Sequence, residues 1–401
     1  MKKHLPCLVL LICLVACTNE ETKFEAAFQE LKSSIQKQYI PDKRVGIWDV
    51  DYRFAKGQII LKGITTSPEA KEALITGLEA KNYQTTDSLQ LLPDETALEG
   101  KTYGIVNLSV CNIRIENDFS SEMVTQALLG MPVRVLQQNG WYHIQTPDNY
   151  MGWVHRTGIV PMTKQEYNEW NASEKLIVTT HYGFAYENPG ATSQPVSDVV
   201  AGDRLRWEGV ESSFYKVSYP DGRKAYIAKS IAKPEQEWRA SLSQDAGSII
   251  RTARSLMGIP YLWAGTSSKG VDCSGFVRAV LYLHDIIIPR DASQQAYVGE
   301  HIDIAPDFGN LQPGDLLFFG RPAAGGKKER VIHVAIYTGN KRFIHSQGYV
   351  QTGSFNREDK DFDEYNLNRL LFAGRILPSV NNSNSNDITT TQTNPYYLPQ
   401  E

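Results

Sequence analysis

The chain has 401 residues, a formal net charge of −4 and 21% charged residues. A chain of this length exceeds a single compact core, so we expect two to four domains. The balance of charges gives no basic surface of the kind that nucleic acids require, and no nucleic-acid partner is expected. The composition is that of a globular protein.

The N-terminus has the pattern of a bacterial export signal. Two lysines follow Met1, residues 5–15 form an apolar run too short to span a bilayer, and the segment ends in Leu-Val-Ala-Cys at Cys17. These four residues resemble a lipobox, which implies cleavage before Cys17 and lipid attachment to it; an ordinary signal peptide is the alternative. We expect residues 1–17 to form the signal and lipobox, and a mature protein anchored by lipid in the cell envelope, on the periplasmic face or outer membrane of a Gram-negative bacterium.

Residues 18–98 are expected to form a small α/β unit. Apolar residues at helical spacing predict a helix over residues 23–40, and strands are expected near residues 57–64 and 88–92. Between them, Ser67 and Pro68 have the pattern of an N-cap and a first helical residue, and the helix is expected to end near residue 80. No chemistry is assigned to this unit.

Residues 100–235 contain an internal repeat. Trp141-Tyr142-His143-Ile144 recurs as Phe214-Tyr215-Lys216-Val217, and Pro147-Asp148 recurs as Pro220-Asp221, both at an offset of 73 residues. A fixed offset indicates two copies of one domain, and the alternating strands with close turns favour small β-barrels. The motifs resemble bacterial SH3-like (SH3b) domains, which we place at residues 99–165 and 174–234. Their aromatic side chains either bind wall peptides or fill the barrel core.

A cysteine at the start of a predicted helix is the main candidate for chemistry. Cys273 lies in Asp-Cys-Ser-Gly, directly before an apolar run that predicts a buried helix over residues 276–283. The free N–H groups and the dipole of such a helix favour a thiolate, although a lone cysteine is often a small core residue. His333 and His345 follow in two strand-like runs joined by a turn, so a hairpin brings them together as neighbours. The pattern is typical of a Cys–His hydrolase.

Residues 245–378 resemble the NlpC/P60 family of cell-wall peptidases. The resemblance implies a papain-like α+β domain in which Cys273 is the nucleophile, His333 the base and His345 the residue that orients His333. It also implies that Tyr261 contributes to the oxyanion site beside the backbone N–H of Cys273. The motifs that carry the resemblance are residues 261–265, Asp272 to Gly275, residues 313–319, residues 332–337 and residues 343–346.

The same resemblance extends to the substrate groove, where Trp263, Asp272 and Ser274 are expected to contact substrate. It implies that Arg290 binds a substrate carboxylate and that Asp291 binds the substrate's N-terminal ammonium group, with a simple helix N-cap as the alternative for Asp291. In relatives with two SH3b domains, the first covers one end of the groove, and Glu122 is the matching acidic residue here.

The resemblance therefore implies cleavage of the γ-D-glutamyl–diamino acid bond in murein stem peptides that have a free N-terminal L-alanine. Two alternatives stay open: a murein D,L-endopeptidase or amidase that acts on intact peptidoglycan, and a non-catalytic wall-binding lipoprotein. No residue cluster has metal-ligand spacing, so no metal or other cofactor is implied.

Two further expectations concern the remaining cysteine and the tail. After residue 17 only Cys111 and Cys273 are left of the five cysteines, and Cys111 is expected to be a core thiol. Residues 379–401 are polar and of low complexity, and we expect them to be disordered.

Overall fold

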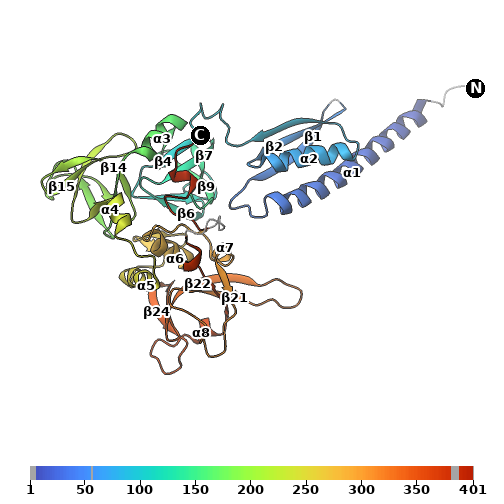
Figure 1. Ribbon diagram of the computed structural model, residues 1–401. Coiled ribbons are helices and arrows are strands. Elements are labelled where there is room, and N and C mark those ends of the chain that lie inside the picture. Colours follow the sequence, from blue (N-terminus) through green and yellow to red (C-terminus); the bar gives the residue numbers. More distant parts are fainter. Residues whose placement is uncertain (1–5, 56, 381–387, 401) are drawn as a thin grey trace, which may run out of the picture. The chain divides into compact units, whose positions relative to one another are not determined.

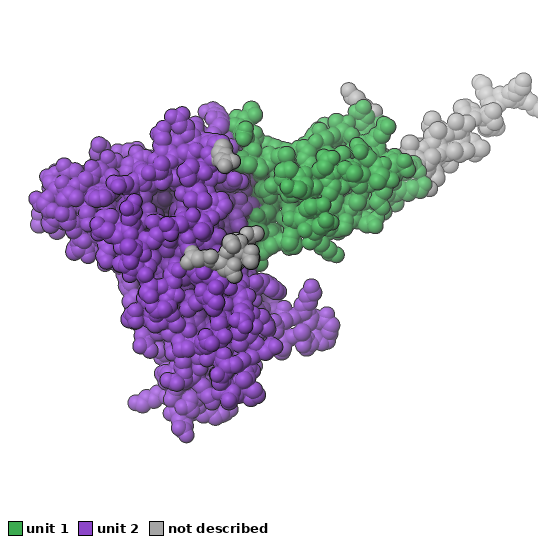
Figure 2. Space-filling model, viewed as in Figure 1, with its two compact units in different colours: residues 1–96 green, residues 97–401 purple. Residues whose placement is uncertain are grey.

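The computed structural model describes residues 6–55, 57–380 and 388–400, with side chains described from residue 20 onward. The chain forms two compact units, residues 1–96 and 97–401 (Figure 2). The side chain of Cys17 lies outside the described part, as do residues 1–5 of the expected signal. Within the described part of the chain, no helix is both long and apolar enough to cross a membrane.

The first unit is a three-stranded sheet with two helices, α1 (Pro6–Tyr39) and α2 (Pro68–Ala80). The strand order is β1-β2-β3, antiparallel between the first two strands and parallel between the last two. Ser67 Oγ accepts the N–H of Ala70 at 3.0 Å, which confirms the predicted cap. The strand bounds are β1 (Trp48–Ala55), β2 (Gln58–Thr65) and β3 (Thr85–Leu91). The sequence had not predicted β1.

The second unit begins with two seven-stranded sheets that share one topology (Figure 1). The first has the order β10-β4-β7-β8-β9-β5-β6 and the second the order β17-β11-β14-β15-β16-β12-β13, which match strand for strand. The predicted duplication is therefore confirmed in the strand order.

The strands of the first sheet are β4 (Tyr103–Val106), β5 (Val110–Arg114), β6 (Met123–Leu128), β7 (Pro132–Gln138), β8 (Trp141–Gln145), β9 (Met151–His155) and β10 (Ile159–Met162). Those of the second are β11 (Lys175–Val178), β12 (Gly183–Tyr186), β13 (Pro195–Val199), β14 (Arg204–Glu211), β15 (Phe214–Ser218), β16 (Lys224–Ala228) and β17 (Ala232–Pro234). Helix α3 (Lys164–Ala172) joins the two sheets, and α4 (Glu235–Ala240) follows the last strand of the second sheet.

The aromatic residues of the first sheet lie half-buried in pairs rather than deep in its core. Trp153 stacks on His143 with ring centroids 4.7 Å apart, and Trp141 packs edge-on against His155. Tyr142 packs against the core of the sheet, whose buried residues include Cys111. Cys111 is thus a free core thiol, as expected.

The C-terminal part of the second unit is an α+β domain, as predicted. Its sheet has the order β20-β25-β21-β22-β23-β24, and helix α6 (Cys273–Tyr282) packs against β22 (Figure 1). The other elements are α5 (Ala246–Ser255), β18 (Thr266–Ser267), β19 (Gly270–Val271), α7 (Ala292–Gln295), β20 (Glu300–Ile302), β21 (Leu316–Arg321), β22 (Arg330–Gly339), β23 (Arg342–Gln347), β24 (Tyr349–Ser354), α8 (Glu364–Leu367) and β25 (Leu370–Arg375).

Residues 388–400 pack against several elements of the second unit. Thr389 forms an antiparallel bridge with Ile287, directly after α6 and its turn. Tyr396 is buried, and its hydroxyl donates to Oε1 of Gln145 on β8 at 3.0 Å. The segment therefore contacts both the C-terminal α+β domain and the first seven-stranded sheet.

The predicted disorder of residues 379–401 is wrong for residues 388–400. Of the two low-complexity runs that suggested it, the Asn/Ser run at residues 381–386 falls outside the described residues, whereas the threonine run at residues 389–391 lies within residues 388–400. In this last segment, Ile388 and Tyr396 are buried apolar anchors, so the burial of a few side chains outweighs the polar composition of the segment.

Candidate active site

Cys273 occupies the first position of α6, as the sequence predicts. Asp272 is the N-cap, and its Oδ1 accepts the N–H of Gly275 at 2.7 Å. The Cys273 side chain is buried, and burial, aided by the negative charge of Asp272, raises the pKa of its thiol to about 12. The expected thiolate is therefore disfavoured in the resting enzyme, because desolvation outweighs the helix terminus.

His333 and His345 are joined by a hydrogen bond. Nε2 of His333 lies 2.9 Å from Nδ1 of His345, and both rings are buried. Ile336 on β22 pairs with Ile344 on β23, so the two histidines are diagonal neighbours on one face of the hairpin. The predicted contact is confirmed, and it leaves Nδ1 of His333 as the ring nitrogen available to another partner.

The histidine pair and the cysteine meet at β22. The backbone N–H of Val334, the residue after His333, interacts with the sulfur of Cys273 and opposes the rise of its pKa. Burial lowers the pKa of His333 well below its ordinary value and that of His345 to about 4. Both imidazoles are therefore neutral near pH 7, and the thiol beside them is protonated.

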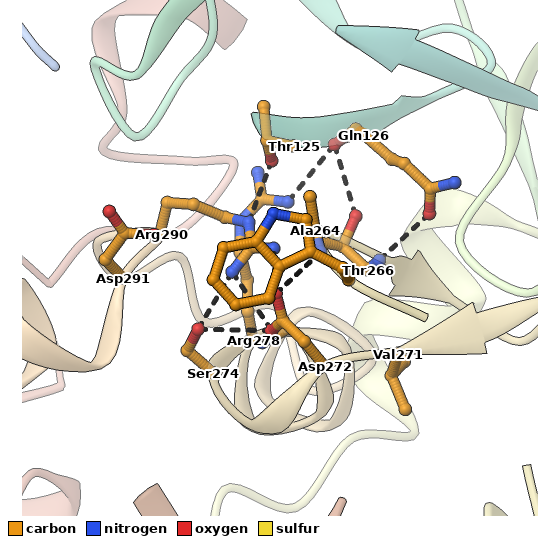
Figure 3. A network of polar contacts seen from close by, with 12 residues as sticks. Thr125, Gln126, Ala264, Thr266, Val271, Asp272, Ser274, Arg278, Arg290 and Asp291 are labelled. Carbon is orange, nitrogen blue, oxygen red and sulfur yellow. Dashed lines mark hydrogen bonds and ion pairs between the residues drawn. The ribbon is translucent and has the colours of Figure 1, made fainter. Parts of the chain in front are cut away.

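Arg290 does not face a substrate groove, contrary to the prediction. Its side chain is 1% exposed, and Nη2 lies 2.6 Å from Oδ2 of Asp272 while Nη1 donates to Ser274 Oγ at 2.9 Å. Nε donates to Oγ1 of Thr125 on β6 at 3.0 Å. The guanidinium therefore lies between the first seven-stranded sheet and the C-terminal domain (Figure 3). The expected role in binding a substrate carboxylate is therefore wrong, because these donors are committed to buried partners.

The same network fixes Asp272 and Ser274, which were expected to contact substrate. Asp272 Oδ2 accepts the N–H of Ala264 at 2.9 Å, and Ser274 Oγ donates to Asp272 Oδ1 at 3.2 Å. Both side chains are buried. They hold the turn before α6 in place and thereby orient the backbone around Cys273 (Figure 3).

Strand β6 of the first sheet forms one side of this region. The side-chain oxygen of Gln126 accepts the N–H of Thr266 at 2.9 Å (Figure 3), and the loop before the strand supplies Glu122. Glu122 Oε1 accepts the indole N–H of Trp263 at 2.8 Å. The structure therefore brings together Glu122 and Trp263, two of the predicted site residues that lie in different domains.

A second contact between the domains involves Asp291. The carboxylate forms a capping box at the start of α7, and its Oδ2 also accepts the hydroxyl proton of Tyr150 at 3.1 Å. The helix-cap interpretation of Asp291 is thus confirmed, and the expected contact with a substrate ammonium group stays a prediction. Tyr150 was missed by the sequence analysis, and no spacing or motif in a single sequence singles it out.

Tyr261 lies beside the cysteine and is 36% exposed. Its backbone N–H donates to Gly348 O at 2.9 Å, which fixes the segment that leads to Trp263. Burial raises the pKa of its phenol, so the hydroxyl is a proton donor at neutral pH. That is the property that an oxyanion-stabilising group requires.

Comparisons with known proteins agree with this geometry. Residues 258–363 match the NlpC/P60 family, and residues 113–159 match the bacterial dipeptidyl-peptidase SH3 domain. The chain belongs to the NlpC/P60 family, and it is a cysteine peptidase of that family.

Particular relatives carry more specific names. A γ-D-glutamyl-L-lysine dipeptidyl-peptidase of Bacillus cereus is 33% identical over 236 residues, which cover 57% of this chain and 68% of the relative. Dipeptidyl-peptidase 6 of Lysinibacillus sphaericus is 27% identical over 256 residues, or 60% of this chain and 86% of the relative. The crystal structure of an NlpC/P60 family protein from Bacillus cereus superposes with a TM-score of 0.57 at 25% identity, covering 69% of this chain and all of that one.

Proposed function

We propose that the protein hydrolyses the γ-D-glutamyl–diamino acid bond of murein stem peptides that have a free N-terminal L-alanine. The family and the named dipeptidyl-peptidase relatives support the hydrolysis of murein peptides. The proposed restriction to peptides with a free N-terminus rests on the contact between Glu122 and Trp263. This contact sets a carboxylate from another domain beside the segment that leads to the proposed nucleophile.

In the proposed mechanism, Cys273 is the nucleophile and His333 is the general base. The thiol and the imidazole both start neutral, so His333 takes the thiol proton as the sulfur attacks the γ-carbonyl carbon. The tetrahedral intermediate collapses to a thioester when His333 returns the proton to the leaving amine. Water then hydrolyses the thioester, again with His333 as base, and the thiol is regenerated.

His345 is the proposed positioning residue for His333. Its 2.9 Å hydrogen bond to Nε2 directs the opposite ring nitrogen of His333 toward the cysteine. The oxyanion is stabilised by the backbone N–H of Cys273 and the hydroxyl of Tyr261. Donors of this kind contribute on the order of 3 kcal/mol to the transition state.

Glu122 and Asp291 are the proposed partners of the substrate ammonium group. A charge-assisted hydrogen bond to a carboxylate is stronger than one between neutral groups, so a blocked amine is bound less well. Tyr150 donates to Asp291 and keeps its carboxylate oriented. A glycan-linked stem peptide has no free N-terminal amine, so its N-terminus cannot form these charge-assisted hydrogen bonds.

We also propose that Cys17 carries a lipid and that the protein acts in the envelope of a Gram-negative bacterium. The support is the apolar run that ends in Leu-Val-Ala-Cys, together with the cell-wall substrates of the family. Labelling of living cells with a radioactive fatty acid tests the anchor. Loss of the label in a Cys17→Ala variant supports it, and an unlabelled parent protein contradicts it.

The function is tested with the protein lacking residues 1–17, L-Ala-γ-D-Glu-diaminopimelate and its N-acetylated form. Mass spectrometry is expected to detect L-Ala-γ-D-Glu only from the free peptide. Glu122→Gln is expected to raise KM about tenfold or more, while Glu116→Gln in the same exposed loop leaves it unchanged.

Three other outcomes are informative. Equal cleavage of both peptides would remove the amine-binding role of Glu122 and Asp291. Digestion of intact sacculi as fast as the free peptide would favour the murein endopeptidase or amidase alternative. Failure to cleave any of these substrates would contradict the proposal and favour a wall-binding lipoprotein.

A further inference from the structure

The substrate proposed above carries carboxylates on both sides of the scissile bond. One is the α-carboxylate of D-Glu, which the γ-linkage leaves free, and the other belongs to the diamino acid. Arg290 is buried and paired with Asp272, so it is not available to either of them. A cation that recognises either group must therefore be a different residue.

Arg369 lies between α8 and β25, and its guanidinium is held in a fixed orientation. Nε and Nη2 both donate to Oδ1 of Asn366, at 2.9 and 2.6 Å. The Cζ atom of Arg369 is 4.4 Å from the ring centroid of Tyr365 and 5.8 Å from that of Phe319. A guanidinium fixed between rings and an amide loses little entropy when it binds a ligand.

The same group lies on the side of the catalytic histidines. The Phe319 ring on which Arg369 packs is 5.4 Å from the ring of His333. Asn366 Nδ2 donates to Oε1 of Gln347 at 3.2 Å, and Gln347 is two residues after His345 on β23, hence on the same face. The positive charge of Arg369 acts on both histidines and on Cys273.

Arg369 has no carboxylate partner among the described residues. The charge of Asp363 acts on Arg369, but the two Asp363 oxygens accept the backbone N–H and the side-chain amide of Asn366. Nη1 of Arg369 donates to no described residue, and the side chain is only partly buried. An ordered, partly buried guanidinium that makes no direct ion pair is typical of a site that receives an anion.

We infer that Arg369 is a specificity-determining residue that binds a substrate carboxylate next to the scissile bond. This inference rests on the proposed function, because that function supplies the carboxylates. The Nη1 edge is available to either the α-carboxylate of D-Glu or the carboxylate of the diamino acid. The two sources are distinguished by amidating one carboxylate at a time.

The experiment compares three peptides with a free N-terminus: L-Ala-γ-D-Glu-L-Lys, its D-isoglutamine analogue and its C-terminal carboxamide. The parent enzyme is expected to prefer the first peptide over one of the amides by about 10- to 100-fold in kcat/KM. Arg369→Gln is expected to abolish that preference by lowering kcat/KM for the carboxylate substrate only. Arg369→Lys keeps the charge and is expected to restore part of the preference, and Arg357→Gln, at an exposed arginine on the Phe362 ring, is expected to change nothing.

A merely structural role of Arg369 would lower kcat/KM for all three peptides equally, and that result would overturn the inference. Equal cleavage of all three peptides by the parent enzyme would also overturn it while leaving the proposed function intact. If the parent enzyme cleaves none of them, the proposed function itself fails. Thermal unfolding of each variant establishes that the compared proteins are folded.

Discussion

At the scale of single residues, Cys273 and His333 lie in surroundings that favour their neutral forms. Raising the thiol pKa from 9 to about 12 corresponds to roughly 4 kcal/mol against the thiolate. The start of a helix offers at most about 2 kcal/mol in favour of an anion. Burial therefore dominates, and in the proposed mechanism the proton moves during the attack rather than before it.

The buried histidines predict a specific dependence of stability on pH. In the unfolded chain both rings titrate near pH 6.5, whereas His345 in the folded protein has a pKa of about 4. As the pH falls from 6.5 to 4, the unfolded chain binds protons that the folded chain does not. Stability that is present above pH 6.5 is thus lost on acidification, on the order of 3 kcal/mol for His345 alone.

Urea unfolding at pH 7 and at pH 4.5 measures this effect. The parent protein is expected to lose more free energy of unfolding between the two pH values than a His345→Gln variant does, since glutamine does not titrate. An identical loss in both proteins would show that His345 takes up its proton as readily when folded as when unfolded.

At the scale of elements, the features that depend on neighbouring residues in the chain could be predicted from the sequence. Asp272 before an apolar run predicted the N-cap of α6, and the turn between two strand-like runs predicted the hairpin that joins His333 to His345. These features depend on residues close together in the chain, where capping and alternation leave a pattern.

Features that depend on contacts between residues far apart in the chain could not be predicted from the sequence. The role of Arg290 was mistaken because its partner Thr125 comes from another domain, and nothing in the order of residues reveals that contact. Tyr150 was missed for the same reason, since its hydroxyl meets Asp291 across the domain boundary. The packing of residues 388–400 likewise depends on surfaces that exist only once the rest of the chain has folded.

The C-terminal segment is expected to contribute to stability through its buried tyrosine. Tyr396 is 8% exposed, and Tyr396→Ala removes both its packing and its hydrogen bond to Gln145. We expect a loss of roughly 3 kcal/mol in the free energy of unfolding. Tyr297 is 87% exposed, so Tyr297→Ala is the matched control and is expected to change stability by less than about 0.5 kcal/mol. Equal effects of the two substitutions in urea unfolding would mean that residues 388–400 do not pack as described.

At the scale of the whole molecule, the first seven-stranded sheet and the catalytic domain share a continuous interior. Tyr282 and Ile287 of the catalytic domain belong to the same buried cluster as Val133 of β7. Arg278 and Asp148 form a buried ion pair across the boundary, with Nε and Oδ2 3.1 Å apart. Separating the two domains would expose this shared apolar cluster to water, so the domains are expected to act as one body.

The site residues that the structure brings together all lie within residues 97–401. A protein consisting of residues 97–401 alone is therefore expected to keep kcat/KM for the free tripeptide within about twofold of the value for residues 18–401. The comparison is made by measuring dipeptide release at several peptide concentrations. A loss of tenfold or more with a normally folded protein would show that residues 18–96 take part in catalysis.

The most direct test of the account is the capture of the acyl-enzyme. The protein is mixed with L-Ala-γ-D-Glu-diaminopimelate, quenched in acid within milliseconds, digested and sequenced by mass spectrometry. We expect an L-Ala-γ-D-Glu acyl group on Cys273, none on Cys111, and no adduct or turnover with Cys273→Ala. An adduct on another residue, or dipeptide release by the Cys273→Ala variant, would contradict it.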